Sequence, residues 1–338
     1  MSTAPLGEMG EMGEMGEMGE MGEEAALGLV GDVGATNARF RLVNQKHEWA
    51  SDLLVLPTTQ FNEGADLLRA AHAHFNSPAL TQCVLAVAGP VSTDGSSIQV
   101  INTGLSFEQA SVQAVIGVTP IFHNDFFVQA RALPYLTELV QIGGDKGADG
   151  VKAILGPGSG LGMATLVPDM AGNLTVLPSE GGHGDLAPGS YLEAELWSVL
   201  AQTHAHVSWE TVLSGPGIVN LYQAMSSVWG MEAAPTSAEE IVQQGLSAEP
   251  LCHQTLETFA GLLGGAAGNL ALTVGARGGV YISGGIAPKL VDMLPTSPLR
   301  RRFDERGDLS DYAKAIPLYV VMDEQPGLLG ARHTLIDL

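Results

Sequence analysis

The stretch LGLVGDVGATNARFRLV, residues 27–43, places a turn of small and polar residues between two segments that we expect to be strands, Leu27–Val30 and Arg39–Val43. Glycine in such a turn lets the main chain approach a ligand closely, so that its amide groups can point at ligand oxygens. Thr36 adds a hydroxyl donor. Asp32 would repel a phosphate unless Mg²⁺ or its water shell lay between them, and we expect it to serve that ion through water. For this segment alone, an ordinary glycine-rich hairpin is the alternative.

Two later segments repeat the pattern of a strand followed by glycines. ILGPGSGLGMATLV, residues 154–167, reads as strand, glycine loop and strand, and suggests that two lobes grip one polyphosphate. GVYISGGIAPK, residues 279–289, is a strand that ends in a glycine pair, against which a flat group such as adenine could lie. The residues that we assign to ATP are Gly31, Asp32, Val33, Gly34, Ala35, Thr36, Asn37, Gly158, Ser159, Gly160, Gly284 and Gly285.

Composition and motifs exclude several classes of protein. The net charge of −22 makes nucleic acid and anionic membrane surfaces poor partners. The chain has neither a Gly-x-x-x-x-Gly-Lys-Ser/Thr loop nor a complete dinucleotide-binding motif. Two isolated cysteines suggest neither a disulfide framework nor a zinc site, and they favour a reducing cytoplasm. Residues 258–276 are uncharged, but their apolar residues follow a helical period, so we expect a buried helix with a glycine face rather than a membrane span.

Strands and helices alternate along the chain, which predicts an α/β protein with a mixed or parallel sheet. The glutamate-methionine-glycine repeats of residues 8–22 predict a disordered tail over residues 1–24. Ser106 with Gln109 and Ser237 with Glu240 have the spacing of capping boxes. The expected helices are Gly64–His74, Phe107–Ile116, Phe126–Leu136 and Gln325–Leu338, and the further expected strands are Val84–Val87, Ala153–Leu155, Met163–Val167 and Gly279–Ile282.

Four further segments make the chain resemble the bacterial glucokinase family, the group of the actin-like ATPase superfamily that lacks the cysteine zinc motif. They are HNDFFVQA (123–130), LPSEGGHGDLAP (177–188), LSGPGIVNLY (213–222) and QPGLLGAR (325–332), and the likeness runs from about Leu27 to the end. The resemblance implies a two-domain fold with a cleft for sugar and ATP, phosphorylation of glucose on its 6-hydroxyl, Mg²⁺, and a cytoplasmic homodimer. It also implies that residues 25–135 with 323–338 form a small domain and 136–322 a large one.

The resemblance gives particular residues a role. Asp125 would be the general base that accepts the proton of the sugar hydroxyl, although its position also suits a cap of the following helix. Asn124 beside it can give and accept hydrogen bonds. The two glycines between Glu180 and His183 require a loop that lets both side chains converge on sugar hydroxyls, and a metal site or a surface turn are the alternatives. The residues expected to bind the sugar are Asn102, Asn124, Asp125, Glu180, His183 and Glu210.

The sequence departs from the family at three positions. Ala35 replaces the second glycine of the first loop, which adds a methyl group where the backbone would meet phosphate. Ser159 stands in place of the common threonine but keeps the hydroxyl, and Phe107 stands where an indole is usual. Two other functions compete with a glucokinase: a kinase for another hexose or an amino sugar, and a non-enzymatic sugar sensor or actin-like ATPase. Asp125 and the SEGGH segment argue against the latter.

Overall fold

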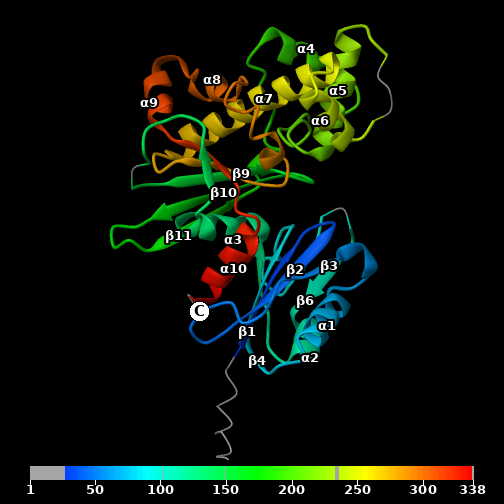
Figure 1. Cartoon of the computed structure of the whole chain (residues 1–338), viewed down its shortest axis with the longest axis vertical. Coiled ribbons are helices and arrows are strands. Elements are labelled where there is room, and N and C mark those ends of the chain that lie inside the picture. The colour runs from blue at the N-terminus through cyan, green and yellow to red at the C-terminus, as the bar shows by residue number, and fades with distance from the viewer. Residues whose placement is uncertain (1–26, 102, 148, 233–235, 337–338) are drawn as a thin grey trace, which may run out of the picture.

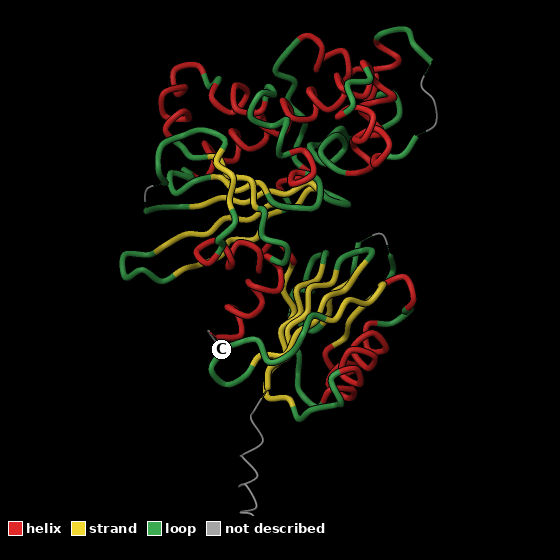
Figure 2. The backbone as a smooth tube through the Cα atoms, viewed as in Figure 1, coloured by secondary structure: helices red, strands yellow, loops and turns green. Residues whose placement is uncertain are grey.

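The computed structural model describes residues 27–101, 103–147, 149–232 and 236–336, and the expected tail lies outside them. The described chain is a mixed α/β protein built around two larger sheets, which Figure 2 shows as two separate groups of strands. A small antiparallel pair, β5 (Ser97–Gln99) with β6 (Ser106–Glu108), accompanies the first sheet. The expected fold class, α/β with a mixed sheet, is therefore confirmed.

The first sheet has the strand order β3-β2-β1-β4-β7. Its centre is β1 (Leu27–Val33), which pairs antiparallel with β2 (Asn37–Val43) and parallel with β4 (Leu80–Val87). Strand β3 (Leu54–Pro57) lies beside β2, and β7 (Ile121–Asn124) lies beside β4. Parallel pairing of β1, β4 and β7 brings their carboxyl ends to one edge, which is where the first glycine turn and the Asn124-Asp125 pair begin.

Helices cover both faces of this sheet. Leu29 faces the cluster that includes α1 (Gly64–His74) and α2 (Gln109–Ile116), whereas its neighbour Val30 faces α10 (Pro326–Ile336). Successive strand residues point to opposite faces, so the continuous apolar run of β1 requires cover on both sides. The C-terminal helix supplies the second cover, as Figure 1 shows.

The second sheet has the strand order β11-β10-β9-β12-β13-β8. Its larger helical layer lies on one face, and α3 (Asp125–Ala132) packs on the other through Phe126 and Ala130. Figure 1 shows α3 and α10 between the two sheets. The strands are β8 (Leu139–Gln141), β9 (Lys152–Pro157), β10 (Leu161–Pro168), β11 (Leu174–Ser179), β12 (Val280–Ile282) and β13 (Leu318–Val321), and the helices of the layer are α4 (Tyr191–Leu200), α5 (Gly215–Val228), α6 (Ala238–Leu246), α7 (Pro250–Val274), α8 (Leu299–Asp304) and α9 (Ser310–Ala315).

The glycine face expected in residues 258–276 lies on α7 and admits a neighbouring main chain. A Cβ atom at Gly264 would overlap the carbonyl oxygen of Leu299 in α8, and one at Gly268 would overlap the guanidinium of Arg306. Helices α7 and α8 can therefore approach at backbone distance at Gly264, which a larger residue there would prevent, whereas Gly268 makes room for a side chain that follows α8. Within the described chain, no helix has the length and apolarity needed to cross a membrane.

Several expected boundaries need correction. The first strand extends to Val33, so the turn itself is residues 34–36. Ser106 caps no helix: it belongs to β6, and α2 begins at Gln109 without a side-chain cap at Glu108. The pairing of β5 with β6 holds this segment extended, which a local spacing rule cannot anticipate. The expected helix 126–136 ends at Ala132, because Pro134 lies in a 3₁₀ turn, Leu133–Tyr135.

Other expectations about elements hold. The helix Gly64–His74 has the predicted bounds. Ser237 and Glu240 form a capping box at the start of α6, with both reciprocal hydrogen bonds present. The strand expected at Gly279–Ile282 and the helix expected from Gln325 match to within a residue or two among the described residues, as β12 from Val280 and α10 from Pro326. Strand β13, which lies between them, is not among the expected strands. Elements that carry their own local signals are thus the ones that the sequence predicts best.

Candidate active site

The first glycine turn links β1 to β2 and is fixed by a residue from outside it. The amide of Gly34 donates to the carbonyl of Asn37 at 3.0 Å, which closes the turn. Buried Thr58 donates its hydroxyl to the Ala35 carbonyl at 2.6 Å and its amide to the Thr36 carbonyl at 3.0 Å. Thr36 remains exposed. Sequence reasoning missed Thr58 because a single threonine after β3 carries no local signal of this contact.

Three of the residues assigned to ATP in this segment also have a packing role. A Cβ atom at Gly31 would lie 2.7 Å from the ring of Phe40, so glycine is needed there by the core. Val33 is buried within β1. Ala35 packs against the same apolar cluster, so its methyl group is directed into protein, not toward the outer side of the turn. Alanine in place of glycine at position 35 therefore adds no atom on the exposed side of the turn.

Asp32 lies at the carboxyl end of β1 and against the first turn of α10. A Cβ atom at Gly327 would lie 2.5 Å from its Oδ2 atom. A helix amino terminus favours a nearby carboxylate, because its first amide groups and the helix dipole present positive charge. Burial nevertheless raises the pKa of Asp32, and Arg39 opposes that rise. The helix terminus and Arg39 therefore favour the charged form of Asp32, whereas burial disfavours it.

Asn124 ends β7, two strands away from β1, and Asp125, which follows it, is near enough to Asp32 to be affected by its charge. Asn124 caps α3: its Oδ1 atom accepts from the Phe126 amide at 2.9 Å, and its Nδ2 atom donates to the Gly89 carbonyl at 3.1 Å. Asp125 is the first helical residue, and its Oδ1 atom also accepts from the Phe126 amide at 2.9 Å. Asn124 is therefore the N-cap of α3. Asp125 uses only its Oδ1 atom for the Phe126 amide, and its Oδ2 atom makes no bond to that amide.

Burial raises the pKa of Asp125 to about 7, with smaller contributions from the charges of Asp32 and Glu180. Asp32 and Glu180, from two other parts of the chain, therefore lie close enough to affect Asp125. A carboxylate with a pKa near neutrality is well suited to accept a proton during a reaction at neutral pH. The structure thus brings together the Asp32, Asp125 and Glu180 positions that the sequence singled out separately.

The second glycine loop joins β9 to β10. The amide of Gly158 donates to the Gly160 carbonyl at 2.8 Å, and the Gly158 carbonyl accepts from the Gly215 amide at 2.8 Å. Ser159 at the tip is exposed. The two outer glycines of this segment have another purpose, because Cβ atoms at Gly156 and Gly162 would collide with the ring of Phe126 in α3. The exposed tip, residues 158–160, is the part available to a ligand.

The SEGGH segment and Glu210 form one unit with this loop. Glu210 Oε2 accepts from the Leu161 amide at 2.8 Å, and the Glu210 amide donates to the Gly182 carbonyl at 2.8 Å. Glu210 Oε1 lies 4.0 Å from Nε2 of His183, which follows Glu180 in a 3₁₀ turn, Gly181–His183. Within the described residues, no group of three or more His, Cys, Asp or Glu side chains is placed to hold a metal ion.

The third loop rests on the second. The Ser283 amide donates to the Leu155 carbonyl at 2.8 Å. Gly284 has φ of +83°, a conformation that favours glycine, and it packs on the carbonyl of Pro157. Gly285 faces open space. Asn102, the remaining candidate for sugar binding, lies outside the described residues.

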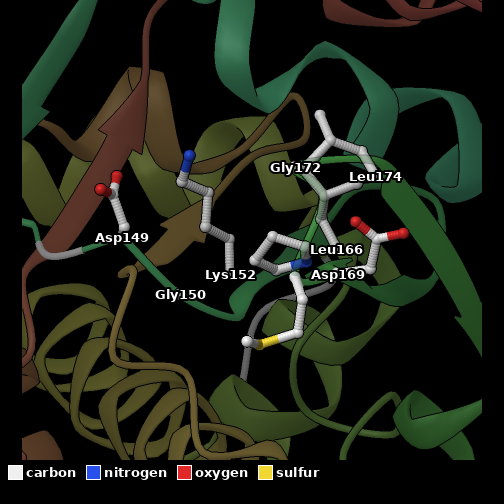
Figure 3. Close-up of a pocket in the computed structure, with 9 residues that line it drawn as sticks. Asp149, Gly150, Lys152, Leu166, Asp169, Gly172 and Leu174 are labelled. Carbon is white, nitrogen blue, oxygen red and sulfur yellow. The ribbon is translucent and has the colours of Figure 1, made fainter.

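A hollow of about 470 Å³ lies elsewhere, at the other end of β9 and β10 (Figure 3). Lys152 lines it and pairs with Leu166, whereas the glycine loop lies beyond the pair Pro157 and Leu161. A strand rises about 3.3 Å per residue, so about five residues of β9 separate this hollow from the loop by roughly 17 Å. It is therefore not part of the site formed by the three loops.

The arrangement defines a class of protein. Two β-hairpin loops, a glycine pair and a cluster of carboxylates between two sheets are the features of an ATP-dependent phosphotransferase with the actin-like ATPase fold. A crystal structure of a glucokinase from an Antarctic psychrotroph matches the fold with a TM-score of 0.80, at 35% identity, and the match covers 92% of this chain and 99% of that one. A ROK family glucokinase from Streptomyces griseus, 15% identical, shares the fold with a TM-score of 0.63 over 91% of this chain and 99% of that one.

Sequence comparison identifies the family. The model of the family described as Glucokinase matches residues 29–337. A glucokinase of Campylobacter jejuni subsp. doylei is 38% identical over 309 residues, which cover 90% of this chain and 92% of that protein. The chain belongs to the glucokinase family, whose members transfer a phosphoryl group from ATP to glucose. The resemblance inferred from the four short segments is confirmed.

Proposed function

We propose that Asp125 is the general base in the transfer of the γ-phosphoryl group of ATP to the 6-hydroxyl of glucose. The observation that carries this role is the place of Asp125 as the first residue of α3, the helix that Figure 1 shows between the two sheets, where burial raises its pKa to about 7. Phosphoryl transfer needs little covalent chemistry from a protein: alignment, neutralisation of charge and removal of the acceptor proton suffice. The S. griseus enzyme was solved in complex with glucose and AMPPNP, which supports one sugar and one nucleotide as the ligands of this fold.

Glu180, His183 and Glu210 are proposed to read the hydroxyl groups of the sugar. Glu210 uses one carboxylate oxygen for the Leu161 amide, and its other oxygen faces His183. An analogue that lacks one hydroxyl would leave a polar group unpaired, at a cost of about 1–3 kcal/mol. Asn124 is proposed to act with them, although both ends of its side-chain amide already bond to protein.

The residues of the first turn fit a nucleotide-bound Mg²⁺. Asp32 offers one carboxylate. Burial raises the pKa of Asp32, and the charge of Asp32 adds to the raised pKa of Asp125, so a cation between them would favour the charged form of both. Magnesium keeps several waters and needs few protein ligands, so a single carboxylate acting through water is sufficient. When bound, the ion would neutralise charge on the phosphates. The turns of residues 34–36 and 158–160 are proposed to hold the phosphates through amides other than those of Gly34 and Gly158, which bond within their own turns. Gly284 and Gly285 are proposed to hold the adenosine.

A panel of hexoses and amino sugars tests the proposed substrate. Each sugar is incubated with Mg-ATP beside a control without sugar, ADP release is followed, and the product is identified by phosphorus NMR. Release with glucose and formation of glucose 6-phosphate support the proposal. Turnover of another hexose alone would move the sugar assignment to a different kinase of the superfamily, and ADP release without sugar would favour an ATPase.

We propose that residues 25–135 with 323–338 move as one lobe and residues 136–322 as the other. The two crossing segments are tied together, since Asp323 accepts from the Glu138 amide at 2.9 Å and from the Thr137 amide at 3.3 Å. Closure of the lobes over sugar would keep water from the γ-phosphate. Small-angle scattering is expected to show compaction when glucose is added, and an unchanged radius of gyration would contradict closure.

The assembly and the compartment are also proposals. A homodimer is expected from the family resemblance, and light scattering coupled to gel filtration should give twice the mass of the 338-residue chain. A reducing cytoplasm is supported by the cysteines: Cys83 and Cys252 are both free and buried. A single-chain mass would remove the homodimer.

A further inference from the structure

Helix α3 carries a second polar residue that touches the nucleotide side of the site. Gln129 lies one turn after Asp125, and its Oε1 atom accepts a hydrogen bond from the hydroxyl of Ser283 at 2.7 Å. Ser283 is 2% exposed and immediately precedes Gly284 and Gly285. The contact therefore joins the helix that begins with Asp125 to the loop assigned to adenosine, across 154 residues of sequence.

The same helix is seated in the second glycine loop through Phe126. The ring fills the space above Gly156 and Gly162, where any Cβ atom would collide with it. A Cβ atom at Gly156 would also lie 2.9 Å from the carbonyl carbon of Ser283 and 3.0 Å from the amide nitrogen of Gly284. Phe126, the strand ends of β9 and β10, and the Ser283 main chain thus pack at one place.

The opposite side of α3 rests on α10. A Cβ atom at Gly330 would overlap the carbonyl oxygen of Val128, so the two helices touch through their backbones. Glycine contacts and an apolar ring fix the separation of α3 from its neighbours, but they permit sliding and rotation. A hydrogen bond has a strong preference for direction. Asn124 at the start of α3 bonds to the Gly89 carbonyl and Arg131 near its end to the Leu174 carbonyl, and the bond of Gln129 is the one that ties the helix to the third loop.

We propose that the hydrogen bond between Ser283 and Gln129 is a positioning contact that sets Asp125 relative to the nucleotide loops. Gln129 and Ser283 act through Asp125, so this inference rests on its proposed role as the base. Small misplacement of a reacting group lowers the rate strongly, because catalysis depends on near-attack geometry. The contact would thus link the position of the loop assigned to adenosine, residues 283–285, to the orientation of the Asp125 carboxylate.

The test uses Ser283→Ala, Gln129→Met and the double variant. Each single change leaves the other partner of this pair, buried Ser283 or half-buried Gln129, without its hydrogen bond. We expect a loss of stability together with a decrease in kcat of about fivefold, with KM for glucose changed less than twofold. The double variant removes both partners, so its Tm should return toward the wild-type value while kcat stays low. A role in stability alone predicts instead that kcat recovers with Tm, and that result, or normal kcat in the single variants, would overturn the proposal.

Controls separate this inference from the proposed base. Ser283→Thr keeps the hydroxyl and should retain kcat within twofold. This variant keeps the proposal testable if the other variants fold poorly. Ser226→Ala is the matched control and should have a normal kcat. Ser226 lies in α5, away from the site, is also 2% exposed, and donates its hydroxyl to the Met231 carbonyl at 2.7 Å. If Asp125→Asn stays active, the base assignment fails, whereas an inactive Asp125→Asn beside fully active Ser283 and Gln129 variants refutes this inference alone.

Discussion

Replacing Asp125 by Asn should abolish most activity and yet stabilise the protein. Asn is nearly isosteric, so its Oδ1 atom can still accept from the Phe126 amide, as Asp125 does at 2.9 Å. The substitution removes the proton-accepting carboxylate, and loss of a general base typically lowers kcat by about 10²–10⁴-fold. It also removes a charge that burial, Asp32 and Glu180 all disfavour.

The size of the stabilisation follows from the pKa. The pKa of Asp125 rises from its ordinary value of 3.8 to about 7 in the folded protein. One pKa unit corresponds to ~1.4 kcal/mol, so the cost of the charged form has an upper limit of about 4 kcal/mol. Partial access of water and the new amide group reduce the gain, and we expect about 1–2 kcal/mol at pH 8.

The sign depends on pH. Between pH 3.8 and 7 the folded state binds a proton at Asp125 that the unfolded state releases, so the wild-type protein loses stability as pH rises through this window. The stabilisation by Asn should therefore be present at pH 8 and small at pH 5. Urea unfolding at both pH values measures it, with Asp308→Asn, the same chemical change at an exposed carboxylate, as the control. Equal or lower stability of Asp125→Asn at pH 8 would refute the reasoning.

Three further predictions concern packing and support. Ala35→Gly should leave KM for ATP within twofold and lower the free energy of unfolding in urea by about 0.5–1 kcal/mol, because the methyl group packs on the core. A strong gain in ATP affinity would contradict that orientation of the methyl group. Gly162→Ala should lower both stability, by about 1–3 kcal/mol, and kcat, because its methyl group collides with Phe126; normal kinetics would show that α3 is not seated there. Arg302→Met should lower the free energy of unfolding by about 3–5 kcal/mol, because it leaves buried Glu193 without the guanidinium that lies 2.9 Å away. The kcat of the folded fraction should be preserved. A loss of stability below about 1 kcal/mol would contradict the buried ion pair.

The sequence singles out the candidate site residues more readily than the residues that support them. The glycine turns, Asp125 and SEGGH carry compact local patterns, and in the structure the charges of Asp32 and Glu180 both raise the pKa of Asp125. Thr58 lies 23 residues from the carbonyl of Ala35 that it holds. Such a contact depends on the pairing of β2 with β3 and leaves no local pattern. The same reason applies to the hydrogen bond of Gln129 with Ser283.

Glycines illustrate the limit of motif reasoning. The sequence shows that Gly156, Gly158, Gly160 and Gly162 alternate along the second loop, but it does not show which face each glycine leaves open. In the structure, Gly156 and Gly162 make room for Phe126, and Gly158 has no neighbour within 4 Å of its missing Cβ. One pattern therefore serves two purposes, packing of α3 and exposure of the loop tip, and only the fold separates them.

The pH dependence of kcat, at saturating glucose and Mg-ATP, tests the central claim about Asp125 most directly. If Asp125 is the base, kcat should rise tenfold per pH unit below pH 7, level off above it, and lose this dependence in Asp125→Asn. A wild-type kcat that is flat from pH 5 to pH 9, with phosphoryl transfer as the rate-limiting step, would contradict the account.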